Sequence, residues 1–143
     1  MSRDNELETL RESFDKSHYA TLLGMKLVGL ARGYARVSLR IDDRFQNWDR
    51  VIHGGLVSSL VDQAFGCALN TLERRYVAVQ LSVNFMAAPK VNDTIISEGR
   101  VIHSGMSLGV AQMVVKDSQD RIIATATGTA LGMERGGIAE DDS

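Results

Sequence analysis

One run of the sequence restricts the possible folds of this chain more than any other. From Leu56 to Leu72, apolar side chains recur at spacings of three and four residues, which is the period of an α-helix. The stripe comprises Val57, Leu60, Val61, Ala64, Phe65, Ala68, Leu69 and Leu72. Because it is wide, the predicted helix must be buried over much of its circumference. The rest of the chain therefore has to cover a central helix.

Most of the remaining sequence shows the alternation of apolar and polar residues that is typical of half-buried strands. Strands are predicted at Tyr34–Ile41, Val77–Phe85, Thr94–His103, Ser107–Lys116 and Ile122–Met133, and a short helix at Asn5–Lys16. Strands on either side of a single helix indicate an α+β fold with an antiparallel sheet. A curved antiparallel sheet wrapped around one long central helix is the simplest arrangement that buries the helix.

Length, charge and cysteine usage limit the organisation of the protein and its surroundings. The 143 residues fit one domain, 1–143, with a helical N-terminal segment, 1–23, and a polar tail, 134–143, that is expected to fray. A net charge of −2 offers no basic surface for nucleic acid. No apolar run reaches the roughly 18 residues of a membrane span. The single cysteine, Cys67, excludes an intrachain disulfide and fits a cytoplasmic protein.

The segment that enters the long helix has residues suited to chemistry. Gly54 and Gly55 stand at the predicted helix N-terminus, where backbone N–H groups are unpaired and the helix dipole is positive. Glycine lets a carbonyl oxygen approach the backbone closely, and such N–H groups stabilise an oxyanion. A Gly-Gly pair is also common in plain turns. Nearby, Asn47 either orients a water or caps a turn. His53 is a candidate pocket donor, general base or structural histidine, and a positioning role is favoured.

Asp62 lies inside the predicted helix, although aspartate is a poor helix former. Ser58, Ser59 and Gly66 stand about one turn away and are small, which leaves space above the carboxylate. A lone helical aspartate is most simply part of a solvated face, but its combination with the preceding loop favours a catalytic role. Three scattered histidines and one cysteine have no metal-ligand spacing, so neither a metal nor a cofactor is predicted.

Together these residues resemble the motif of the phenylacetate-pathway (PaaI-type) hotdog thioesterases. The matching residues are Asn47, the triplet His53-Gly54-Gly55 six residues further on, and Asp62 nine residues after His53. Val79–Phe85 and Ile123–Thr129 resemble two strands of the same family, and the likeness extends roughly from Gly24 to Met133. Each part of the motif is weak alone, whereas the combination is fairly specific.

The resemblance implies a hotdog fold and hydrolysis of acyl-CoA thioesters at the interface of a homodimer, often within a dimer of dimers. It implies that Asp62 acts as general base or nucleophile and that the Gly55 N–H polarises the thioester carbonyl. Asn47 would position the attacking water or nucleophile, and His53 would shape the pocket. The implied CoA contacts are Gln80, Phe85 and the turn formed by His103, Ser104, Gly105, Met106 and Ser107.

Three positions depart from the family pattern. Arg50 stands where the family commonly has glycine, Ala78 where it commonly has Ser or Thr, and Met106 where Arg often follows the glycine. If a hydroxyl normally assists the carboxylate, its absence at Ala78 leaves Gln80 as the substitute. The missing arginine weakens a phosphate contact.

Two other functions are compatible with the same fold. Enoyl-CoA hydratases pair a helical Asp with a His about five residues further on, and Cys67 at that position argues against hydration. A non-catalytic acyl-CoA-binding module is the alternative from a different class, because Ala78 lacks the expected hydroxyl.

Overall fold

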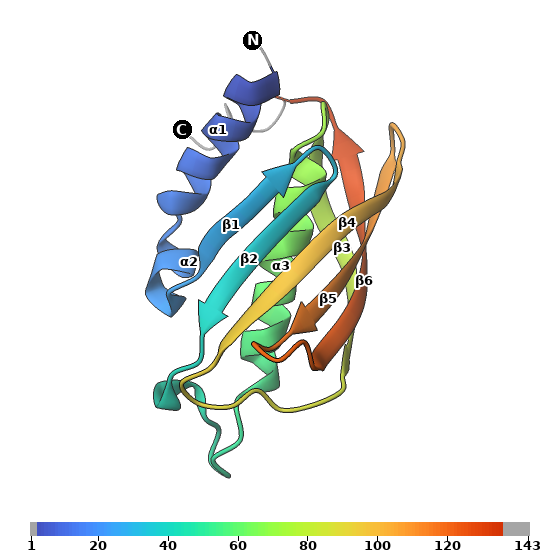
Figure 1. Ribbon diagram of the computed structural model, residues 1–143. Helices are drawn as coiled ribbons and strands as arrows, with labels where there is room; N and C mark the ends of the chain where they lie inside the picture. Colours follow the sequence, from blue (N-terminus) through green and yellow to red (C-terminus); the bar gives the residue numbers. More distant parts are fainter. Residues whose placement is uncertain (1–2, 136–143) are drawn as a thin grey trace.

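The structure, a computed structural model, describes residues 3–135 and consists of a six-stranded antiparallel sheet curved around one long helix (Figure 1). The elements are α1 (Arg3–Asp15), α2 (His18–Leu23), β1 (Lys26–Ala31), β2 (Tyr34–Arg40), a 3-10 turn η1 (Asp43–Phe45), α3 (Gly54–Asn70), β3 (Arg75–Phe85), β4 (Thr94–Ser104), β5 (Leu108–Lys116) and β6 (Ile122–Met133). The strand order is β1-β2-β4-β5-β6-β3, so β1 and β3 form the two edges. The α+β prediction of a sheet around a central helix is confirmed.

The central helix α3 is fixed against the sheet by close approaches at two glycines. A Cβ on Gly99 of β4 would lie 2.9 Å from the Ala64 carbonyl oxygen, and a Cβ on Gly128 of β6 would lie 2.6 Å from the Phe65 ring. Larger residues at either position would push the helix away, so this packing fixes the distance of α3 from the sheet. No helix within residues 3–135 is long and apolar enough to cross a membrane.

The elements predicted from the sequence are confirmed within two residues at each end, but β1 was not predicted, and α2 was expected only as an undivided part of the helical segment 1–23. In β1 a bulge between Leu27 and Gly29 interrupts the alternation on which strand prediction depends. The six-residue helix α2 is defined by its ends: Ser17 caps its N-terminus and Gly24 adopts a left-handed conformation after it. The expected fraying concerns residues 134–143, of which 136–143 lie outside the described residues.

Candidate active site

The loop before α3 is organised by Asn47. Its Oδ1 accepts hydrogen bonds from the N–H groups of Asp49 at 2.8 Å and Val51 at 3.1 Å. Its own N–H donates to the Val51 carbonyl oxygen at 2.7 Å. His53 follows as the N-cap of α3, and its side chain makes no capping hydrogen bond. The N-terminal turn of α3, including the Gly55 N–H, is therefore not capped by a side chain.

Arg50, one of the departures from the family motif, has a φ of 60°. This is the left-handed region, which glycine adopts without steric cost and an L-residue with a Cβ does not. The preference for glycine at this position therefore has a conformational cause. The arginine is exposed in the single chain, and the departure from glycine adds backbone strain to the loop.

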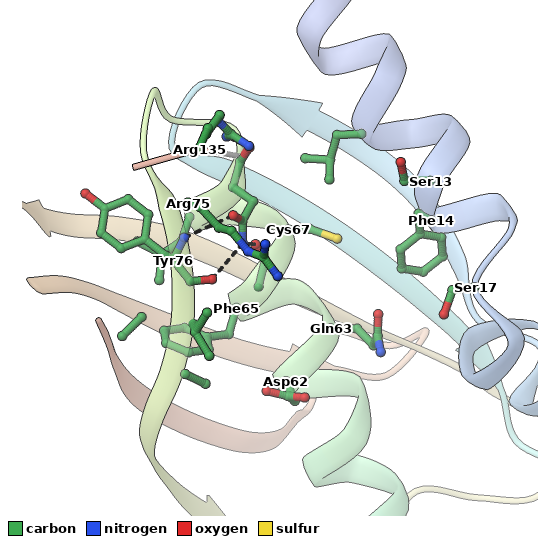
Figure 2. Close-up of a pocket in the computed structure, with 17 residues that line it drawn as sticks. Ser13, Phe14, Ser17, Asp62, Gln63, Phe65, Cys67, Arg75, Tyr76 and Arg135 are labelled. Atoms are coloured by element: carbon green, nitrogen blue, oxygen red, sulfur yellow. Dashed lines mark hydrogen bonds between the residues drawn. The ribbon is translucent and has the colours of Figure 1, made fainter. Parts of the chain in front are cut away.

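Asp62 lies about two turns into α3 and borders a cavity of about 740 Å³ (Figure 2). The cavity is lined by Leu10, Ser13, Phe14, Ser17, Asp62, Gln63, Phe65, Gly66, Cys67, Leu69, Asn70, Arg75, Tyr76, Val77, Ala78, Ala130 and Arg135. Although the side chain is accessible in the single chain, surrounding protein atoms desolvate it and raise the pKa of the carboxyl above 3.8. A carboxylate beside a cavity, with its proton affinity raised, suits a general base.

Two other residues of this cavity bear on the predicted chemistry. Ala78 lines it together with Asp62, so the position at which the family commonly has a hydroxyl does face the carboxylate's cavity. Cys67 is buried there, and desolvation, with a smaller effect of the Asp62 charge, raises the pKa of its thiol to about 12. Cys67 is therefore a neutral thiol at neutral pH, which makes it a poor nucleophile.

The structure does not bring Asp62 and the start of α3 into one pocket. Asn47, Gly54 and Phe85 line a second cavity, of about 380 Å³, at the N-terminal end of the helix. There the Phe85 ring covers Gly54, and a Cβ added at Gly54 would lie 3.3 Å from the ring. Gly55 and Asp62 are seven residues apart on α3, or about 10 Å along its axis. The candidate catalytic residues are thus split between two places in one chain.

The candidate CoA-binding residues are split in the same way. Phe85 ends β3, whereas the His103–Ser107 turn lies at the beginning of β3, where the Tyr76 hydroxyl donates to the Gly105 carbonyl oxygen at 3.0 Å. These two ends are about 33 Å apart, because β3 has 11 residues. Gln80 lies between them, beside a bulge at Val79.

Arg74 is a residue near the candidate CoA turn that the sequence motifs did not reveal. A Cβ on Gly132 would meet both the Met106 carbonyl oxygen, at 2.8 Å, and the Arg74 Nε, at 3.4 Å. That Nε is buried and has no hydrogen bond to any described residue. Arg74 comes close to Met106 because the connection between α3 and β3 packs against β6. A contact between segments so distant in the sequence cannot be predicted from a local pattern. Within residues 3–135, no three His, Cys, Asp or Glu side chains are grouped so that they could hold a metal ion.

Comparison with known proteins identifies the family. The pattern of the Thioesterase superfamily matches residues 50–124, just over half of the chain, including the start of α3, Asp62 and β3. The chain belongs to the thioesterase superfamily. A putative esterase of Archaeoglobus fulgidus is 31% identical over 108 residues, which cover 76% of this chain and 70% of that protein.

Two further relatives of this thioesterase have informative descriptions. The acyl-coenzyme A thioesterase PaaI of Escherichia coli is 26% identical over 115 residues, covering 80% of this chain and 82% of that protein. The structure of E. coli PaaI superimposes with a TM-score of 0.87 over 92% of this chain and 96% of that chain. A Streptococcus mutans protein, solved bound to acetyl-CoA, gives a TM-score of 0.74 at 26% identity over 77% of this chain and 89% of that chain. The predicted hotdog fold and PaaI-type family are confirmed.

Proposed function

We propose that this thioesterase hydrolyses acyl-CoA to the free acid and CoA at active sites shared between two copies of the chain. The observation that carries the proposal is the desolvated Asp62 carboxylate at the edge of a large open cavity. E. coli PaaI bears the name of an acyl-CoA thioesterase, and the S. mutans relative was crystallised with acetyl-CoA, which supports CoA esters as the substrate class.

In the proposed reaction, Asp62 takes a proton from water while the water oxygen attacks the thioester carbonyl carbon. The carbonyl oxygen becomes an oxyanion, which accepts a hydrogen bond from the Gly55 N–H at the positive end of α3. When this tetrahedral intermediate collapses, the carbon–sulfur bond breaks. The CoA sulfur takes the proton back from Asp62, and CoA leaves as the free thiol. Alternatively, Asp62 itself attacks the carbonyl carbon, the carbon–sulfur bond breaks and CoA leaves as the thiolate. Water then hydrolyses the resulting mixed anhydride, which frees the acid and regenerates Asp62, and the proton released from the water neutralises the thiolate.

One chain cannot perform this reaction alone, because Gly55 and Asp62 lie about 10 Å apart along α3. Two copies related by a two-fold axis near Ser58 and Ser59, midway between these residues, place the Asp62 of one helix opposite the Gly55 of the other. Antiparallel pairing of the two β3 edges places the Phe85 of one chain at the Gly105 turn of the other. The same symmetry thus unites both split sets of residues.

The remaining candidates have roles that fit this assembly. Gln80, Phe85 and the His103–Ser107 turn contact CoA, and Arg74 beside Met106 supplies the cation that the turn itself lacks. Asn47 uses its Oδ1 to hold the loop, so its amide Nδ2 is the group available to the attacking water or nucleophile. His53, which is exposed and whose side chain makes no capping hydrogen bond, shapes the pocket entrance. Pairs of dimers form a tetramer.

The central test is Asp62→Asn, compared with Asp120→Asn as a matched change at an exposed aspartate far along the chain. CoA release from acyl-CoA esters is followed with a thiol-trapping dye. Loss of a general base should lower kcat by about two to four decades in Asp62→Asn and leave Asp120→Asn unchanged. Activity of Asp62→Asn within about threefold of wild type, well short of that loss, contradicts the proposed role. Ala78→Ser, which restores a hydroxyl to the cavity, should raise kcat.

The non-catalytic acyl-CoA-binding module is distinguished by the same assay. If wild type binds acyl-CoA in calorimetry but releases no thiol above the Asp62→Asn background, the protein is a binding module. The absence of a hydroxyl at Ala78, in the cavity of Asp62, is the observation that favours this alternative.

A further inference from the structure

The cavity beside Asp62 extends away from the reacting centre, between two helices. Helix α1 packs beside β1, where the Arg11 Nη1 donates to the Leu27 carbonyl oxygen at 3.1 Å. This arrangement leaves a gap between α1 and α3, and Leu10, Ser13 and Phe14 line the α1 side of it. Figure 2 shows Ser13 and Phe14 on the opposite side of the cavity from Asp62 and Cys67.

Gly66 stands where this gap meets α3, four residues after Asp62 and so on the same face of the helix. Glycine weakens a helix interior, and its φ here is not positive. A Cβ on Gly66 would meet nothing within 4 Å, in contrast to Gly99 and Gly128, where helix–sheet contact demands glycine. Within one chain, neither backbone conformation nor packing requires glycine at position 66. Its effect is to leave space open beside the carboxylate.

The direction of this space fits the acyl part of a substrate. In the shared site of the proposed function, the second copy's antiparallel helix faces Asp62 with its Gly55 and begins at Gly54, opposite Gln63. Gly66 lies beyond the start of that helix, about 6 Å further along α3 than Asp62. The cavity of about 740 Å³ is of the size that holds a whole drug-sized ligand. An acetyl group would fill only a small part of it.

We propose that the acyl group lies over Gly66, between α3 and α1, and that Gly66 determines the acceptance of acyl groups much larger than acetyl, such as aromatic or medium-chain ones. This inference rests on the proposed function and adds the substrate class to it. The two walls are independent, because Gly66 belongs to α3 and Ser13 to α1. A bulky side chain introduced from either wall should therefore exclude large acyl groups.

The test compares Gly66→Leu and Ser13→Leu with Glu12→Leu, which introduces the same side chain next to Ser13 at an exposed position outside the cavity lining. For each variant, kcat/KM is measured with acetyl-CoA, octanoyl-CoA and phenylacetyl-CoA. The ratio of kcat/KM for the large esters to that for acetyl-CoA should fall about tenfold or more in the first two variants. It should stay at the wild-type value in Glu12→Leu.

Two further measurements separate folding and function from specificity. Gly66→Ala should raise the thermal unfolding midpoint, because alanine favours the helix and its Cβ meets open space. Binding is measured in an Asp62→Asn background, in which the ester is not hydrolysed. There, Gly66→Leu should lower the affinity for phenylacetyl-CoA about tenfold more than it lowers the affinity for acetyl-CoA. If wild type hydrolyses the esters but both Leu variants keep the wild-type ratio, the acyl site lies elsewhere while the proposed function stands. If wild type hydrolyses none and Asp62→Asn binds none, both proposals fail.

Discussion

Desolvation raises the pKa of the Asp62 carboxyl above 3.8, so the folded protein disfavours its charged form. A group with a raised folded-state pKa stabilises the fold below its unfolded pKa, and this stability is lost as the pH rises through the folded pKa. At neutral pH, therefore, the ionised carboxylate, which the proposed reaction needs, lowers the free energy of unfolding. The position combines a proposed functional role with a stability cost.

This linkage predicts that Asp62→Asn unfolds at a higher temperature than wild type at neutral pH. The advantage should shrink as the pH falls and vanish well below 3.8, where the wild-type carboxyl is protonated in both states. Thermal melts followed by circular dichroism across this pH range measure the effect, with Glu12→Gln, which also replaces an exposed carboxylate by its amide, as the control. A variant less stable than wild type at neutral pH would show that Asp62 stabilises the fold and that its desolvation is not the dominant effect.

Arg50 gives a second prediction at the scale of one residue. Its left-handed backbone, with a φ of 60°, costs a non-glycine residue about 1–2 kcal/mol, of which part is offset by the greater freedom of glycine in the unfolded chain. Arg50→Gly should therefore raise the free energy of unfolding by about 0.5–1 kcal/mol. Urea denaturation measures this change, and Arg44→Gly, at an exposed position of the preceding η1 turn, should be neutral or destabilising. A loss of stability in Arg50→Gly would mean that the arginine side chain makes a contact that outweighs the strain.

At the scale of elements, the two sheet edges differ in what they offer to a partner. The β3 edge has 11 residues and exposes Val77 at 42% and Val79 at 61%, whereas the β1 edge has 6 residues and borders α1. A long, apolar, unpaired edge is a template for another strand. This contrast favours β3 as the strand that pairs in the proposed dimer.

The edge prediction can be tested with a matched pair of valines, because Val79 and Val28 each lie at a bulge, one on either edge. A lysine on an edge strand opposes pairing through its charge and its desolvation. Val79→Lys should shift the mass in light scattering toward that of one 15.6 kDa chain and abolish turnover, while Val28→Lys should leave both unchanged. A wild-type monomer at micromolar concentration, or an unaffected Val79→Lys assembly, would contradict pairing through β3.

The same elements show how far prediction from sequence reaches. The wide apolar stripe at Leu56–Leu72 and the alternation in β2 through β6 are local patterns, so the central helix and five strands were predicted. β1 was missed because its bulge at Val28 breaks the alternation. The strand order was not predictable, because pairing β3 with β6 rather than β4 depends on contacts between distant residues. The proximity of Arg74 to Met106 and the α1 wall of the Asp62 cavity arise in the same way and leave no local signal.

At the scale of the whole molecule, a shared site predicts that two inactive variants can complement each other in a mixed dimer. In the proposed dimer, each site takes Asp62 from one chain and the Gly55 N–H from the other, so each chain contributes to both sites. Asp62→Asn removes the base, and Gly55→Pro removes the oxyanion donor, since proline has no N–H. Proline is tolerated in the first turn of a helix, so α3 should still form in Gly55→Pro.

A mixed dimer of these two variants has one site with both defects and one site with neither. It should therefore regain about half of the wild-type activity, although each parent is inactive, because a two-fold symmetric dimer has two equivalent sites. Differently tagged chains, refolded together and isolated by sequential affinity steps, give the mixed dimer for the thiol-release assay, and circular dichroism verifies that both parents are folded. Mixing Asp62→Asn with Asp62→Asn/Gly55→Pro provides the control, since no intact site forms. If verified mixed dimers of folded chains stay inactive, Asp62 acts on a thioester held by its own chain, and the oxyanion donor must be sought within reach of that carboxylate, among the groups that line its own cavity.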